Sequence, residues 1–150
     1  MPRYVATVQS PLSVEKAFAF LSDMRQYPSW DPSMSGARQV QGDGPGPDAE
    51  VVLEFGGVGP VRLALRYAVV EYDPPGRMDI EASHNIFVHS YDRVTVVPSG
   101  DGCLATYDAT FRMRGPLGPF DALNTWWFRR LSDRAGAGLS HALGGTLVTT

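Results

Sequence analysis

Two polar residues, Ser90 and Asp92, interrupt the apolar face of segment 86–97, which otherwise has the pattern of one long β-strand. Because successive strand residues point to opposite faces, both lie on the same face as Val88 and Val94. A carboxyl group on an apolar inner face is poorly hydrated, and the loss of hydration raises its pKa towards neutral pH. Such a group can take up or release a proton during a reaction, so Asp92 is a candidate general acid or base.

The sequence leaves two interpretations of Asp92 open. In the first, the residue makes a structural hydrogen bond or ion pair, with Ser90 as a near partner, or a shift of strand register exposes it. In the second, it lies in an apolar cavity opposite the small residue Ala109 and moves protons. An unpaired carboxylate on an inner face is unfavourable, so a buried Asp92 requires a polar partner in either case.

Three further residues place a polar tip on a predicted inner face: Tyr67, Tyr107 and Asn124. Each tyrosine either lines a core with its hydroxyl group bonded or contacts a ligand. Asn124 falls on the buried side of a predicted helix, where its amide would orient a ligand carbonyl or bond to the backbone. The catalytic hypothesis therefore combines Asp92 with Tyr67 or Tyr107 in proton transfer.

Other kinds of chemistry have little support. Ser90 has no histidine in position to activate it. The three histidines fall in a predicted turn, on the polar outer face and near the chain end: His84, His89 and His141. One cysteine cannot form a disulfide within the chain, and no spacing of His, Asp and Glu suggests a metal site. We therefore expect neither a metal nor a cofactor.

The composition excludes further classes. The chain has 150 residues, enough for one domain over 1–150, with a net charge of -3 and 43% hydrophobic residues. Its 13 basic residues are scattered, which argues against nucleic-acid binding. No apolar run approaches the roughly 18 residues of a membrane span, and no signal-peptide pattern opens the chain. We expect a cytoplasmic protein without an integral membrane segment.

The predicted elements place these residues on a large antiparallel sheet. A strand over 4–9 precedes a helix over 13–23 with Ser13 as its N-cap, and Pro28 and Pro32 then limit any second helix to about one turn. Phe120, Leu123, Trp127, Leu131, Ala135 and Ala142 recur at helical spacing, which predicts one long helix over 119–143. Six further strands separated by Gly- and Pro-rich turns are predicted at 37–41, 50–56, 61–72, 77–83, 86–97 and 103–114.

The hairpin formed by the last two strands has a predicted register. If "SGDG" is the loop, Pro98 faces Cys103 and Asp92 faces Ala109. The outer face then pairs Arg93 with Asp108, an opposite-charge pair. The same counting through "DPPG", with an odd-length loop around His84–Ile86, predicts a concave face made of Leu65, Tyr67, Val69, Met78, Ile80, Val88, Val94, Tyr107, Phe111 and Met113.

Several strings resemble a known superfamily. The N-terminal string is "VQSPLSVEKAFAFLSDMRQYPSWDPSM", and the later ones are "ATYDATFRMRGPLGPFDAL" and "WFRRLSDRAGAGLSHAL". Together they resemble the START/Bet v 1-like (SRPBCC) superfamily, specifically its bacterial polyketide cyclase/dehydrase and lipid-transport branch. The resemblance covers essentially the whole chain, but this superfamily has no universal catalytic motif.

The resemblance implies an α+β helix-grip fold, in which a curved seven-stranded antiparallel sheet wraps a long C-terminal helix, with element order β-α-α-β6-α. In relatives, the cavity between sheet and helix holds lipids, sterols, polyketides or other apolar molecules. Because members include carriers, ligand sensors, cyclases and chaperone-binding modules, the fold alone does not choose the function.

Three functions follow, in order of preference. The first is binding of a hydrophobic small molecule between the sheet and the 119–143 helix. The second is a polyketide cyclase/dehydratase-type enzyme that uses Asp92 with a tyrosine. The third is a protein-interaction module, which would need a large exposed apolar patch, and the polar outer strand faces argue against one. The sequence leaves open whether the protein forms a homodimer. The predicted ligand-binding residues are Leu65, Tyr67, Val69, Ile80, Val88, Ser90, Asp92, Tyr107, Phe111, Asn124, Trp127 and Leu131.

Overall fold

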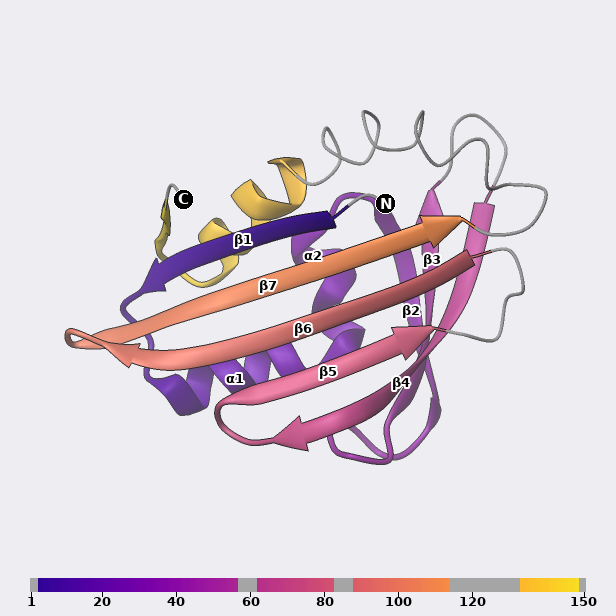
Figure 1. Cartoon of the computed structure of the whole chain (residues 1–150), viewed down its shortest axis with the longest axis horizontal. Coiled ribbons are helices and arrows are strands. Elements are labelled where there is room, and N and C mark those ends of the chain that lie inside the picture. Colours follow the sequence, from indigo (N-terminus) through magenta and orange to yellow (C-terminus); the bar gives the residue numbers. More distant parts are fainter. Residues whose placement is uncertain (1–2, 57–61, 83–87, 114–132, 149–150) are drawn as a thin grey trace.

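A computed structural model describes residues 3–56, 62–82, 88–113 and 133–148. The strands form an eight-stranded antiparallel sheet in the order β2-β3-β4-β5-β6-β7-β1-β8 (Figure 1). The elements are β1 (Arg3–Ser10), α1 (Val14–Ser22), the 3-10 turn η1 (Met24–Gln26), α2 (Tyr27–Trp30), β2 (Met34–Gln41), β3 (Glu50–Gly56), β4 (Arg62–Asp73), β5 (Arg77–Ala82), β6 (Val88–Ser99), β7 (Gly102–Met113), a C-terminal helix at 133–142, and β8 (Thr146–Val148).

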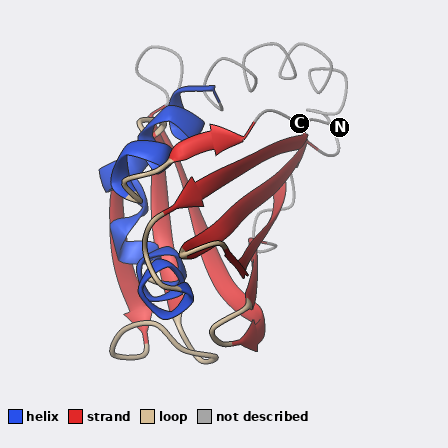
Figure 2. Ribbon diagram, turned by 90° about the vertical axis from the view of Figure 1, so that its left-hand side faces the viewer, coloured by secondary structure: helices blue, strands red, loops and turns tan. Residues whose placement is uncertain are grey.

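The helices form where the sequence predicts them. The Ser13 hydroxyl accepts a hydrogen bond from the Lys16 amide at 3.2 Å and caps α1, whose inner side buries Phe18 and Leu21. Pro28 lies in the first turn of α2, which ends after one turn. Figure 1 shows α1 and α2 behind the sheet, and Figure 2 shows the strands bending around these helices. The described helices therefore cover one face of the sheet, the inner face.

The predicted register is confirmed along the β6–β7 hairpin. Pro98 faces Cys103 and Asp92 faces Ala109, and the ladder continues one pair further, to Ser99 and Gly102. The turn is therefore two residues shorter than the predicted four-residue loop. The pairing of Val69 with Ile80 between β4 and β5 is also confirmed, although a bulge at Val70 shifts the following pairs. The predicted odd-length loop at 84–86 lies outside the described residues.

The predicted inner face is buried as expected. Val69 and Phe111 are partly buried, and the Met113 side chain lies outside the described part of the chain. The members that are fully buried within the core are Leu65, Tyr67, Met78, Ile80, Val88, Val94 and Tyr107. The core thus continues from the sheet into α1, η1 and α2.

The predicted ion pair between Arg93 and Asp108 on the outer face is wrong, because each residue binds another partner. Arg93 and Asp108 do face each other, but the Arg93 guanidinium binds Asp79 on β5, at 3.1 Å. Asp108 instead binds Arg3 on β1, at 2.8 Å. Arg77 also binds Asp79, at 2.8 Å. Burial alone would raise the pKa of Asp79, but the two guanidinium groups and the Tyr91 hydroxyl hold it well below its usual range.

The end of the chain adds a strand that the sequence analysis missed. β8 pairs with β1, so that the sheet has eight strands and not the predicted seven. The Ser10 hydroxyl fixes the end of the preceding helix by donating to the Leu143 carbonyl at 2.7 Å. The described part of the predicted 119–143 helix is 133–142, and residues 119–132 lie outside the described ranges. No helix within those ranges is long and apolar enough to cross a membrane.

Two glycines let the C-terminal helix approach its neighbours. A Cβ atom on Gly136 would lie 2.2 Å from the Tyr4 hydroxyl, and one on Gly138 would lie 1.9 Å from the Trp30 carbonyl oxygen. Real Cβ atoms do not come this close to other heavy atoms. At Gly138 the obstructing atom belongs to the backbone, so the helix requires glycine there, whereas at Gly136 the end of the Tyr4 side chain must move.

Gly138→Ala should lower the free energy of unfolding by about 2 kcal/mol, because the backbone of α2 must move away from the added methyl group. Helix propensity alone predicts the opposite sign, a gain of about 1 kcal/mol, so urea unfolding separates the two effects. Gly76→Ala is the matched control, since its nearest atom outside its neighbours, the Asp73 carbonyl oxygen, is 3.8 Å away. A Gly138→Ala protein as stable as the control would contradict the close contact.

Candidate functional site

Four side chains on the inner face form one hydrogen-bonded series, which we call the polar row. The Tyr67 hydroxyl donates to the Ser90 hydroxyl at 2.7 Å. Ser90 in turn donates to the Asp92 Oδ1 atom at 3.4 Å. The Tyr107 hydroxyl donates to the other carboxyl oxygen of Asp92, at 2.5 Å. The polar partner that a buried Asp92 requires is therefore a pair of hydroxyl groups.

Strand pairing brings these four residues together from β4, β6 and β7. On β6, Ser90 and Asp92 are two residues apart and so share the inner face. Asp92 lies between Ile80 on β5 and Ala109 on β7, so its neighbours on both sides are apolar. The small Ala109 leaves space beside the carboxyl group, which the longer Tyr107 side chain reaches from two residues away on β7.

The whole polar row is buried. The exposed fraction is 1% for Tyr67, 3% for Ser90 and Asp92, and 5% for Tyr107. Burial raises the pKa of Asp92 to about 7, although the hydrogen bonds from Tyr107 and Ser90 act in the opposite direction. The pKa of both tyrosines lies well above its ordinary value, first because of burial and then because of the Asp92 charge. Near neutral pH, the carboxyl group is thus the member of the row that gains or loses a proton.

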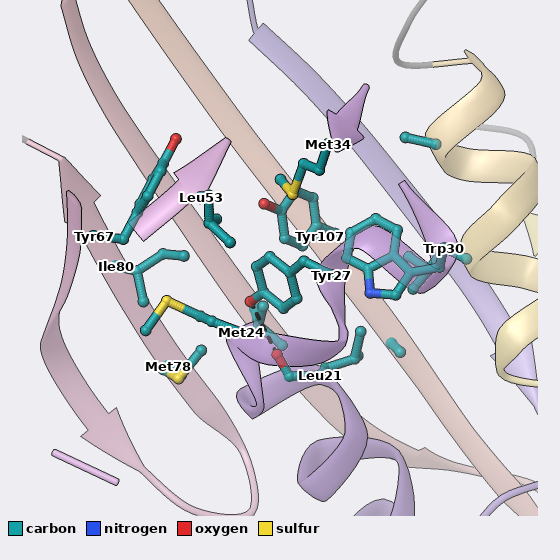
Figure 3. Packing of buried hydrophobic residues seen from close by; sticks show 14 of the residues in the cluster. Leu21, Met24, Tyr27, Trp30, Met34, Leu53, Tyr67, Met78, Ile80 and Tyr107 are labelled. Atoms are coloured by element: carbon teal, nitrogen blue, oxygen red, sulfur yellow. Dashed lines mark hydrogen bonds between the residues drawn. The ribbon is translucent and has the colours of Figure 1, made fainter. Parts of the chain in front are cut away.

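Aromatic rings enclose the Tyr107 end of the row. The Tyr107 ring makes edge contacts with Trp30, at a centroid distance of 5.1 Å, and with Tyr27, at 5.9 Å (Figure 3). Tyr27 is itself fixed, because its hydroxyl donates to the Leu21 carbonyl at 2.9 Å. This end of the row faces the closed part of the core.

The Tyr67 end of the row has different surroundings. Figure 3 shows the Tyr67 hydroxyl directed away from Met24 and Met78. The Tyr67 ring lies 6.5 Å from that of Phe55. Four inner-face residues on this side are only partly buried, and we call them the apolar end of the inner face: Phe55, Leu63, Ala109 and Phe111. The apolar end of the inner face is therefore less buried than the row that it borders.

The structure places nine of the twelve predicted ligand-binding residues on the inner face. Tyr67, Ser90, Asp92 and Tyr107 meet in the polar row. The other five surround it or lie further along the same face: Leu65, Val69, Ile80, Val88 and Phe111. Asn124, Trp127 and Leu131, which would form the opposite helical wall, lie outside the described residues.

Sequence reasoning did not assign Tyr27 or Asp31 to the site. Asp31 is buried and accepts from the Ser33 amide at 2.9 Å and from its hydroxyl at 2.6 Å. Burial raises the pKa of Asp31, and its charge adds to the rise in the pKa of Asp92. The "WDPS" string was the available signal, because an aspartate two residues before a serine often forms a local turn of this kind.

The geometry favours proton transfer over other chemistry. Within the described residues, no group of three or more His, Cys, Asp and Glu side chains could hold a metal ion. His89 lies on the outer face and bonds to Glu81 at 2.6 Å, so it is on the opposite side of the sheet from Ser90. The row offers one carboxyl group whose pKa is about 7, and each of its two oxygen atoms accepts a hydrogen bond from a hydroxyl group.

A comparison with protein-family models decides the family. The model described as "Polyketide cyclase / dehydrase and lipid transport" matches residues 1–144. The chain belongs to this family. The START-like fold expected from the sequence is shown by this match and by solved structures. No curated protein matches the chain.

Solved structures similar to this family member share its fold at low sequence identity. The protein TTHA0849 from Thermus thermophilus has a TM-score of 0.75 and 14% identity, with 95% of each chain covered. A START superfamily protein from Mycobacterium smegmatis has a TM-score of 0.72 and 18% identity, covering 95% of this chain and 97% of its own. The di-domain ARO/CYC StfQ of the steffimycin biosynthetic pathway has a TM-score of 0.69 and 12% identity, and the match covers 94% of this chain but 49% of StfQ.

Proposed function

We propose that the protein binds an apolar small molecule at the apolar end of the inner face, with the polar row as the anchor for a polar group of that molecule. The observation that carries the proposal is the position of the row. Its Tyr67 end borders the partly buried residues Phe55 and Phe111, while its Tyr107 end is closed by aromatic rings. Ligand sites combine a largely apolar lining with a few placed polar groups, which is the arrangement on this face.

The family supports the same class of ligand. Its description joins polyketide cyclisation with lipid transport, and both involve molecules with large apolar parts and few polar groups. StfQ is an ARO/CYC protein of a biosynthetic pathway and shares the fold. Fold similarity does not carry a substrate from one protein to another, so the specific molecule is a matter for experiment.

Blocking the apolar end should prevent binding. Ala109→Phe adds a ring beside Asp92. We expect this ring to weaken binding of the fluorescent aryl ketone prodan about tenfold or more, because it fills the space next to the row. Each factor of ten corresponds to a loss of about 1.4 kcal/mol of binding free energy. The readout is the change in prodan emission on titration with protein. Thr110→Phe is the matched control, because the neighbouring residue of β7 points to the outer face.

Equal weakening by Ala109→Phe and Thr110→Phe would contradict the proposed site. Both variants should first be compared with the natural protein by near-ultraviolet circular dichroism, so that loss of tertiary packing is separated from loss of the site.

A second candidate function is favoured by Asp92 itself. A carboxyl group with a pKa of about 7 is matched to acid–base catalysis at neutral pH. In dehydration of a β-hydroxy ketone, the neutral row would give its proton to the hydroxyl group of the substrate, which leaves as water when its carbon–oxygen bond breaks. The Asp92 carboxylate that remains would take the proton from the carbon next to the carbonyl group, and the electrons of that carbon–hydrogen bond form the carbon–carbon double bond. The row recovers the proton that it gave, so the protein ends unchanged.

A further inference from the structure

The hydrogen bonds of the polar row have a direction that the carboxylate imposes. An ionised carboxylate only accepts, so the hydroxyl groups of Ser90 and Tyr107 both donate to Asp92. The one hydroxyl proton of Ser90 is then committed, so Tyr67 must donate to Ser90. Three contacts use three hydroxyl protons, and the ionised row keeps no donor for a ligand.

One added proton changes what the row offers. A neutral Asp92 carries a proton that it can donate to Ser90, and the Ser90 proton then turns towards Tyr67. The Tyr67 hydroxyl becomes a free donor, because its former acceptor now donates to it. The same proton passed the other way would free the hydroxyl of Tyr107.

The surroundings decide at which end the free donor is available. The Tyr107 ring is in contact with Tyr27 and Trp30 in the closed part of the core. The Tyr67 ring is beside Phe55, and Ser90 is directly opposite Phe111, both members of the apolar end. Tyr67 is therefore the tyrosine of the row that borders the apolar end, and because its side chain is only 1% exposed, a ligand must enter between the residues of that end to reach its hydroxyl.

We propose that the protein selects apolar ligands that carry a carbonyl oxygen, that the Tyr67 hydroxyl donates to this oxygen, and that binding to a protein whose row is ionised brings one proton into the row. This inference rests on the proposed binding function and adds the chemical class of the ligand's polar group. An ionised row offers only lone pairs to a carbonyl oxygen, which also has only lone pairs, so the neutral row binds it and the ionised row repels it.

Asp92 is the group that takes up the proton. The titratable groups that face it are Tyr107 from β7, Tyr67 from β4 and Tyr27 from α2, and the pKa of each tyrosine lies well above 10. The Asp31 carboxylate, just after α2, and Asp108, on the outer face of β7, act on Asp92 through their charge. Since the tyrosines stay protonated near neutral pH, the proton goes to a carboxyl group.

The test compares prodan with its propyl analogue, in which a CH2 group replaces the carbonyl. Above about pH 7, the affinity for prodan should fall about tenfold for each pH unit, as expected for uptake of one proton, while the affinity for the analogue stays flat. Calorimetric titration of the natural protein at about pH 8, in two buffers with different heats of ionisation, should show uptake of about one proton per prodan bound.

Two variants separate the roles of the residues. Asp92→Asn should bind prodan without pH dependence and as tightly as the natural protein at low pH, because the amide always supplies a donor to the row. Tyr67→Phe should bind prodan and its analogue with affinities within about threefold of each other. Asp31→Asn is the control carboxyl, and it should keep the proton uptake.

The outcomes distinguish this proposal from the one on which it rests. Binding of both probes with the same pH dependence and without proton uptake would overturn the carbonyl proposal and leave the binding function standing. Failure of both probes to bind the natural protein would overturn the two together.

Discussion

Asp92→Asn is expected to stabilise the protein at alkaline pH by about 4 kcal/mol. The folded state raises the pKa of Asp92 from the ordinary 3.8 to about 7. A carboxyl group with a raised folded pKa contributes most stability when it is protonated in both states, and this contribution is lost as the pH rises through the folded pKa. The total loss is about 1.4 kcal/mol for each of about three pH units, and asparagine, which cannot ionise, avoids it.

The measurement is urea unfolding of both proteins across pH. The difference in the free energy of unfolding should be near zero at about pH 3, grow between about pH 4 and 7, and then stay constant. Asp101→Asn, in the β6–β7 turn, is the control because its carboxyl group is exposed. Parallel stability curves for Asp92→Asn and the natural protein would show that Asp92 ionises alike in the folded and unfolded states.

The faces of the strands were predictable because two local rules agree. Alternation assigns each residue to a face, and the Gly-containing turn fixes the register, so Asp92 opposite Ala109 followed from the sequence. The contact of Asp92 with Tyr107 was only a hypothesis at the level of the sequence, because it depends on a side chain that reaches across from two residues further along the neighbouring strand. The series from Tyr67 to Ser90 crosses from β4 to β6, beyond the reach of hairpin rules.

The errors have the same physical origin. Arg93 has a neighbouring strand on each side, and hairpin counting considered only the strand carrying Asp108. Asp79 on the other neighbour also binds Arg77 and Tyr91, so one carboxylate collects three donors. The short strand β8 has three residues and too little alternation to be recognised, and its pairing depends on where the preceding helix ends. Contacts between segments far apart in the sequence therefore determine both the ion-pair partner of Arg93 and the pairing of β8.

The largest effect is expected on catalysis, if the second candidate function holds. Asp92→Asn should lower kcat for dehydration of an aryl β-hydroxy ketone by about 10²- to 10⁴-fold, the usual contribution of a general acid or base. The loss should appear in kcat with little change in KM, because asparagine keeps the size and hydrogen-bonding capacity of the row but cannot take the proton. Formation of the enone, followed by its ultraviolet absorbance, measures the rate.

Tyr27→Phe provides the matched comparison. It removes a hydroxyl group that bonds to the Leu21 carbonyl and to no member of the row, so kcat should stay within about threefold of the natural value. In the natural enzyme, kcat should also change with pH near 7, where Asp92 titrates, and this change should be absent from the residual activity of Asp92→Asn. Enone formation at the natural rate by Asp92→Asn would remove Asp92 as the catalyst and leave ligand binding as the function that the polar row serves.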